Sequence, residues 1–173
     1  MSYILQQLLT RSAALYPEKV AVWARGRSLT YRELEERSNQ LAHLLRNRGV
    51  KKGDRIGLFF PKCVESLVCM FGVLKAGGVY VPLDPQAPAD RVGYIIGNCG
   101  IRVLLTNREK RNLFDASVLD KLDFCVMTDG SGANGSGHVV VPWALLAEQP
   151  ASSAPAVTLT ETCLLYTSPS PRD

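Results

Sequence analysis

The hydroxyl-bearing run Tyr166-Thr167-Ser168, near the end of the 173-residue chain, has side chains that could bind a phosphate group. Phosphate-binding loops combine such hydroxyls with backbone N–H groups and with glycines that let the backbone approach the anion. Pro169 and Pro171 follow at once, and a proline has no N–H to donate and fixes its own φ. The candidate nucleotide-binding residues are therefore Thr167 and Ser168, in a loop whose second half is unsuited to phosphate.

A second stretch, Lys75-Ala76-Gly77-Gly78, combines a lysine with two glycines, but its position in the chain argues against phosphate binding. The glycines of a phosphate loop precede a helix, whereas these two follow a stretch with a helical pattern. We predict instead that they end this helix and allow a close approach of the backbone to its neighbours.

The chain offers little for acid–base or metal chemistry. Glu33, Glu35 and Glu36 cluster, and we interpret them as carboxylates that favour the positive end of a helix dipole. With two histidines and no defensible Ser/His/Asp set, we expect no catalytic residue in this chain. The five cysteines form no CxxC pair and lie away from both histidines, so no metal site is predicted.

Composition and charge limit the classes of partner and the cellular compartment that we expect for this protein. The net charge of +4 comes from 20 basic and 16 acidic residues without a basic stripe, which argues against nucleic acid. No apolar run approaches the roughly 18 residues of a membrane span, and the N-terminus has no signal-peptide pattern. Most cysteines lie in apolar runs, as buried thiols of a reducing compartment do, so we expect a cytoplasmic protein.

Alternating helix and strand patterns predict an α/β fold with parallel-sheet layers and flanking helices. Thr30-Tyr31-Arg32-Glu33 fits a capping box, and the helix that it begins is expected to end at Gly49. Residues 131–137 are interpreted as a surface loop and residues 150–155 as a linker-like stretch. The remaining elements are predicted as strands at 20–23, 28–29, 54–60, 79–81, 101–105 and 123–127, and as helices at 4–16, 63–76 and 91–98.

Two motifs in this frame are those of a known superfamily. They are LTYREL at residues 29–34 and LKAGGVYVPLDPQAPADR at residues 74–91. The stretch from 29 to 106 resembles the N-terminal part of the large domain of the AMP-forming adenylating enzymes. That superfamily includes acyl-CoA ligases, the amino-acid-activating domains of peptide synthetases, and firefly-type luciferases. With weaker similarity on both sides, the resemblance covers roughly residues 1–162.

The resemblance implies a chemistry for the parent protein. Members use ATP and Mg²⁺ to convert a small-molecule carboxylate into an acyl-adenylate and pyrophosphate. The acyl group then passes to the thiol of CoA or of the phosphopantetheine on an acyl or peptidyl carrier protein. The residues known to do this mostly belong to later parts of the family's sequence, so the LKAGGVYVPLDP motif is expected to serve packing, and this chain to bind none of the cofactors well.

Three functional hypotheses remain open at this point. Met1 lies just ahead of the first family helix, which favours a fragment of a free-standing acyl-CoA ligase, itself inactive. The first alternative is an amino-acid adenylation domain of a nonribosomal peptide synthetase, because VPLDPxxP reads much like those activators. The second alternative is a truncated, non-catalytic binding protein.

The end of the chain departs from the family. The family's phosphate loop has the form YTSGSTGxPKG, and Tyr166-Thr167-Ser168 arrives in its register, but prolines then replace its first glycine and its threonine, and its lysine is absent. A DNA string that resembles a transposon-based sequencing adapter encodes the run CLLYTSPSPRD without an error. We therefore predict that residues 1–162 are the N-terminal portion of an AMP-binding domain and that residues 163–173 are an adapter-derived tail, not native sequence.

Overall fold

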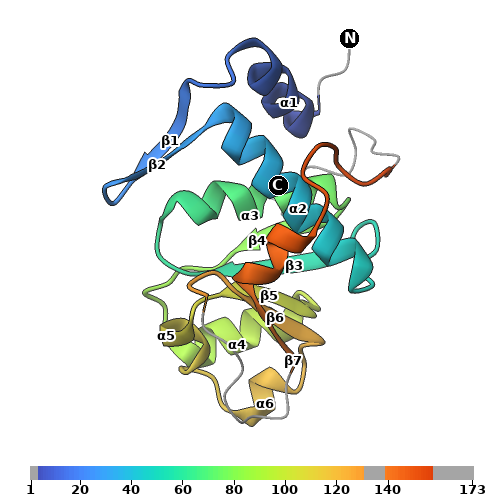
Figure 1. The fold of residues 1–173 in the computed structure, drawn as a ribbon. Helices are drawn as coiled ribbons and strands as arrows, with labels where there is room; N and C mark the ends of the chain where they lie inside the picture. Colours follow the sequence, from blue (N-terminus) through green and yellow to red (C-terminus); the bar gives the residue numbers. More distant parts are fainter. Residues whose placement is uncertain (1–3, 131–138, 158–173) are drawn as a thin grey trace, which may run out of the picture.

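The computed structural model describes residues 4–130 and 139–157, and a parallel sheet is the centre of this part of the chain (Figure 1). Its five strands lie in the order β4-β3-β5-β6-β7, and every neighbouring pair is parallel. The strands are β3 (Arg55–Phe59), β4 (Val79–Pro82), β5 (Val103–Thr106), β6 (Phe124–Met127) and β7 (Val139–Pro142). The predicted α/β fold with a parallel sheet is confirmed, and β7 is a strand that the sequence analysis did not predict.

Helices cover both faces of the sheet, and a small antiparallel ribbon lies beside them (Figure 1). The ribbon pairs β1 (Val20–Ala24) with β2 (Arg27–Thr30). The helices are α1 (Leu5–Leu15), α2 (Tyr31–Asn47), α3 (Val64–Lys75), α4 (Ala89–Asn98), the short α5 (Arg108–Arg111) and α6 (Ala116–Leu119), and the 3-10 helix η1 (Trp143–Glu148). Within the described residues, none of these helices combines the length and the apolar character that crossing a membrane requires.

Alternate side chains of each strand enter two separate cores. One, the α2/α3 core, contains Ile56, Leu105 and Val126 from the sheet together with buried residues of α2 and α3. The other, the α4/α6 core, contains Leu104 and Cys125 from the sheet together with buried residues of α4 and α6. Burial on both faces explains why the strands read as continuous apolar runs in the sequence.

The capping box at the start of α2 is present as predicted. The backbone N–H of Glu33 donates to Thr30 Oγ1 at 3.2 Å, and the N–H of Thr30 donates to Glu33 Oε2 at 2.8 Å. This hydrogen bond from the backbone holds the pKa of Glu33 below its ordinary value. Gly49 has a φ of 88°, so the helix ends in the left-handed conformation that glycine adopts without strain.

The glycine pair after α3 also has the predicted role. Gly77 has a φ of 83°, and the N–H of Gly78 donates to the carbonyl of Val73 at 2.9 Å, which closes the helix end. A Cβ added at Gly78 would lie 3.1 Å from Ile56 Cδ1. A side chain at this position would therefore crowd the sheet, as expected for a close backbone approach.

Candidate functional site

Ligands of open parallel sheets bind outside the carboxyl ends of the strands, so this edge is the first place to look for a site. Thr106 Oγ1 donates to the carbonyl of Phe59 at 2.8 Å, and Thr128 Oγ1 donates to the carbonyl of Thr106 at 3.1 Å. Asp129 accepts a hydrogen bond from the N–H of Arg108 at 2.9 Å. These polar groups hold the strand ends and the following turns together.

A hollow of about 490 Å³ lies next to this edge, between α2, the beginning of α3 and η1. Arg27 and Glu65 on its wall form an ion pair at 2.6 Å, and Arg37 lies 3.7 Å from Glu33. Because each of these arginines has a carboxylate partner, the hollow lacks the concentrated positive charge that a polyphosphate needs.

A buried polar cluster joins the three N-terminal helices. Its centre is Lys75, whose side chain is 2% exposed and whose Nζ lies 2.7 Å from Glu35 Oε2. Lys75 Nζ also donates to Ser38 Oγ at 2.8 Å and to Asn39 Oδ1 at 2.7 Å. Thr10 of α1 donates to the other oxygen of Glu35 at 2.9 Å. We call these five residues the polar cluster.

The surroundings of Lys75 define its role. Burial lowers the pKa of the ammonium, and the hydrogen bond and charge of Glu35 partly offset that effect. Its partners Glu35, Ser38 and Asn39 all lie on α2, so the lysine joins α3 to α2, and it is not among the residues that line the hollow. The prediction that Lys75 does not bind phosphate agrees with this geometry. The interpretation of Glu35 as a carboxylate placed only for the helix dipole is wrong, because it forms an ion pair with Lys75.

Residues 149–153, which we call the strap, lie along α2 after η1 (orange in Figure 1). Asn39 Nδ2 donates to the carbonyl of Ala151 at 2.7 Å, 112 positions along the chain. His43 Nε2 lies 2.9 Å from the carbonyl of Ser153, and Asn47 Nδ2 donates to Gln149 Oε1 at 2.9 Å. The stretch predicted as linker-like at 150–155 has no helix or strand, and side chains of α2 contact two of its carbonyls.

The predicted nucleotide-binding residues, Thr167 and Ser168, lie outside the described residues, as does the predicted tail at 163–173. Among residues 4–130 and 139–157, no group of three His, Cys, Asp or Glu side chains could hold a metal ion. The strap and the four residues after it, 154–157, are the last described part of the chain before Thr167 and Ser168. The described candidate site is therefore the polar cluster with the strap that it holds.

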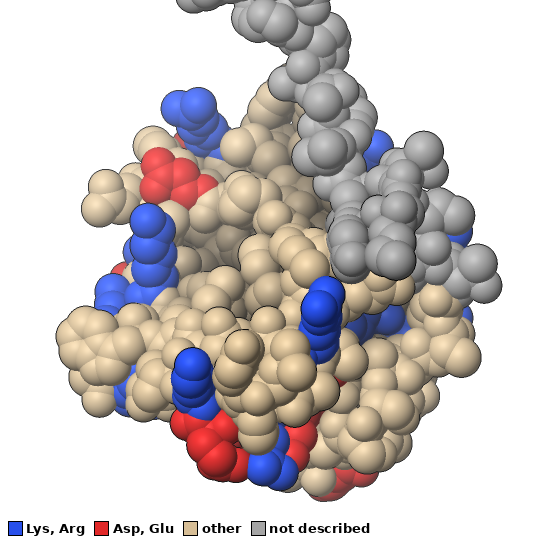
Figure 2. Space-filling view, turned by 90° about the horizontal axis from the view of Figure 1, so that it is seen from above, with Lys and Arg blue, Asp and Glu red and all other residues tan. Residues whose placement is uncertain are grey.

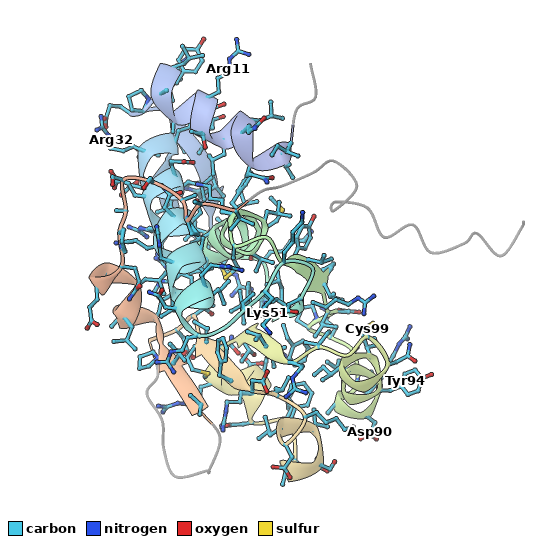
Figure 3. All side chains as sticks on the ribbon, turned by 90° about the vertical axis from the view of Figure 1, so that its right-hand side faces the viewer. Arg11, Arg32, Lys51, Asp90, Tyr94 and Cys99 are labelled. Atoms are coloured by element: carbon cyan, nitrogen blue, oxygen red, sulfur yellow. The ribbon has the colours of Figure 1, made fainter. Side chains whose placement is uncertain are left out.

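The charged surface does not point to another site. On the uncovered part of the face in Figure 2, blue and red side chains lie among tan areas, some of them beside one another, without a continuous basic stripe. Arg11 and Arg32 lie at the outer end of the helical layer, and Tyr94 projects outward from α4 (Figure 3). Arg32 is paired with Glu18 at 2.6 Å.

Comparison with known proteins gives this scaffold its family. A model of the AMP-binding enzyme family matches residues 9–170, a range that includes Thr167 and Ser168. The chain belongs to the AMP-binding enzyme family. This membership confirms the resemblance on which the sequence analysis relied.

Relatives in this AMP-binding family include peptide synthetases. Gramicidin S synthase 2 of Brevibacillus brevis is 44% identical over 138 residues, which cover 80% of this chain and 3% of that protein. The structure of the nonribosomal peptide synthetase FmoA3 matches with a TM-score of 0.72 and 27% identity, over 91% of this chain and 15% of that one. The chain thus spans a small part of each of these relatives.

A CoA ligase has the same fold. The anthranilate CoA ligase AuaEII, solved in complex with anthranoyl-AMP, matches with a TM-score of 0.77 over 89% of this chain and 29% of that one. At 24% identity this match demonstrates the common architecture alone. The AMP-binding scaffold is therefore shared by ligases and synthetases, and the fold does not distinguish between them.

Proposed function

We propose that this AMP-binding chain is the N-terminal part of an amino-acid-activating adenylation domain of the peptide-synthetase type. The observation that carries the proposal is the 44% identity to gramicidin S synthase 2 over 138 residues. It favours the amino-acid adenylation domain of a peptide synthetase over the free-standing acyl-CoA ligase that the sequence analysis preferred. The strength of the argument comes from sequence identity, because the fold is common to both classes.

In the proposed reaction, an amino acid's carboxylate oxygen attacks the α-phosphorus of ATP. The bond between the α- and β-phosphates breaks, so that an aminoacyl-adenylate forms and pyrophosphate leaves. A carrier's phosphopantetheine thiol then displaces AMP and forms a thioester. Mg²⁺ would offset the phosphate charge during the first step. The proposed partners are thus an amino acid as the small-molecule carboxylate, ATP with Mg²⁺, and a carrier protein.

The described residues support this reaction as scaffold. The arginines of the hollow and the lysine of the polar cluster each form an ion pair with a carboxylate. The strap and residues 154–157 are the last described residues before Thr167 and Ser168. We therefore propose that the nucleotide is bound by residues outside those described, and that α2 and α3 hold the strap.

A chimera tests the proposed function. Residues 1–157 of this chain would be joined to the remainder of the matching adenylation domain of gramicidin S synthase 2. We expect amino-acid-dependent exchange of pyrophosphate into ATP, measured over a panel of amino, aryl and fatty acids. The control is a second chimera with the remainder of the anthranilate CoA ligase AuaEII. Anthranilate-dependent exchange by this control, with no exchange by the first chimera although circular dichroism shows that it is folded, would contradict the proposal.

The 173-residue chain itself supplies the companion measurement. Pro169 and Pro171 remove two N–H donors from the position of the phosphate loop, so we expect no pyrophosphate exchange with any acid. Carboxylate-dependent exchange by this chain would refute its predicted inactivity. Two folded chimeras that both lack exchange would favour the remaining hypothesis, a non-catalytic binding protein.

A further inference from the structure

We propose that Asn39 is a positioning residue, whose side-chain amide, oriented by Lys75, fixes the strap on α2. In the whole adenylation domain, the strap would in turn help to position the phosphate-binding loop that follows it in the sequence. The second step rests on the proposed function, whereas the first concerns only contacts between described residues. Neither residue touches the reacting atoms in this proposal.

The two partners of Asn39 determine which way its amide faces. Lys75 is an ammonium and can only donate, so the amide presents Oδ1 to it at 2.7 Å. The carbonyl of Ala151 can only accept, so the amide presents Nδ2 to it, also at 2.7 Å. An amide is the one side-chain group of this size that satisfies both partners at once. The contact with Lys75 thus fixes the amide in the orientation in which Nδ2 of Asn39 donates to the strap.

Lys75 can orient the amide because it is itself fixed. The ammonium has three N–H groups, and its acceptors include the carboxylate of Glu35 and the hydroxyl of Ser38. Thr10 of α1 holds the other carboxylate oxygen of Glu35. The polar cluster therefore places one donor, Asn39 Nδ2, at a defined point beside the strap.

Burial distinguishes the Asn39 contact from the other strap contacts. Asn39 is 1% exposed and its bond to Ala151 is partly buried, whereas the bonds of His43 and Asn47 to the strap are exposed. Water can replace an exposed donor with little loss, whereas a buried amide that loses its partner is left unsatisfied. The Asn39 contact should therefore dominate the order of the strap.

The test uses one isosteric substitution at two positions. In Asn39→Asp, one carboxylate oxygen keeps the contact with Lys75, while the other faces the carbonyl of Ala151 and repels it. In the control Asn47→Asp, the exposed Gln149 side chain can rotate its amide and donate to the new carboxylate. The readout is the backbone order parameter of Ala151 and Ser153, from ¹⁵N relaxation of the labelled 173-residue chain.

For wild type and Asn47→Asp we expect order parameters of about 0.85, and for Asn39→Asp values below about 0.6 with α2 unchanged. Lys75→Met, which removes the group that orients the amide, should also lower the strap values. Unchanged strap values in Asn39→Asp would overturn the proposal, as would an equal fall in Asn47→Asp. This measurement needs no ATP, so its result is independent of the proposed function.

A kinetic measurement tests the second step of the proposal, in which the strap positions the phosphate-binding loop. In the first chimera, Asn39→Asp should raise the KM for ATP about tenfold, with the KM for the amino acid changed less than twofold and Asn47→Asp like wild type. A strap that becomes mobile without any change in the KM for ATP would overturn the claim that it positions the loop. Equal increases for both substrates would also overturn it, because they indicate general damage.

Discussion

The two faces of the same sheet are stabilised in different ways. Of the buried polar side chains among the described residues, all but Thr106 belong to α1, α2 or α3, on the α2/α3 side. The α4/α6 core is built from apolar side chains that α4, α6 and their turns place against the sheet. Apolar packing tolerates many arrangements, whereas a buried ion pair with amide and hydroxyl partners tolerates few. The difference suggests that one face mainly provides stability and the other also specifies geometry.

The strongest test of this difference between the two faces of the sheet is to remove Lys75, the centre of the polar cluster. Lys75→Ala should lower the free energy of unfolding by about 4 kcal/mol, because it leaves the carboxylate of Glu35 and the amide of Asn39 without their partner. The double variant Glu35→Leu with Lys75→Met should lose much less, since both charges are gone. Urea unfolding followed by circular dichroism measures both, with the exposed Lys62→Ala as a control within about 0.5 kcal/mol. A double variant as unstable as the single one would contradict this account.

The corresponding change in the α4/α6 core is Leu104→Ala. Leu104 is fully buried, so the truncation should cost about 3 kcal/mol through lost burial and the cavity that remains. No second substitution should rescue it by matching charge, because no charge pairing is involved. The measurement is again urea unfolding, combined with Lys75→Ala in a double variant. Additive losses are expected for two sites on opposite faces, and a strong coupling between them would contradict the separation of the cores.

The same difference decides what the sequence could predict. Apolar periodicity and turn residues indicated the strands at 54–60 and 101–105 and the helices between them, because burial imposes that pattern directly. The capping box at Thr30 could also be predicted from the sequence, since its partners are three residues apart. β7 was missed because Val139–Pro142 directly follows a glycine-rich stretch, where the apolar pattern weakens.

The polar cluster could not be predicted in the same way, because its partners lie far apart in the chain. Glu35 and Lys75 are 40 positions apart, and Asn39 and Ala151 are 112 apart. One signal was available: Ser38 follows Leu34 by four positions and precedes Leu41 by three, so a polar residue lies on the buried stripe of α2. Such an interruption indicates a buried partner, but it does not say which one. The role of Thr167 and Ser168 in nucleotide binding stays a prediction.

A glycine on each side of the sheet gives a finer comparison. A Cβ at Gly72 of α3 would lie 2.7 Å from Leu41 Cδ2 of α2, so Gly72→Ala should cost about 2 kcal/mol by forcing the two helices apart. A Cβ at Gly97 of α4 would meet only Lys121 Nζ at 3.6 Å. Gly97→Ala should therefore stabilise the protein by about 0.5 kcal/mol through helix propensity. Thermal melts of both variants provide the measurement, and a shift of the same sign in both would contradict the packing argument.

A smaller effect than at the buried cluster is expected for a half-buried polar pair on the α2/α3 side, the capping box of Thr30 and Glu33. Thr30→Ala should cost about 1 kcal/mol at pH 7, because it removes the side-chain acceptor of the Glu33 N–H. The pKa of Glu33 is lowered in the folded state, chiefly by the hydrogen bond from the Thr30 backbone N–H. Its contribution is therefore complete above the unfolded value of about 4.3 and is lost as the pH falls through the folded value.

Glu33→Gln separates this titration from capping itself, because glutamine can still accept the N–H of Thr30 but carries no charge. Urea unfolding of wild type and Glu33→Gln between pH 7 and pH 3 should show the wild type more stable at pH 7 and the two curves converging as the pH falls. A constant difference across this range would mean that the charge of Glu33 does not contribute. In contrast to Lys75, whose partners exclude water, Glu33 lies at a helix end where solvent screens its charge, and this explains why the buried pair should outweigh the half-buried one.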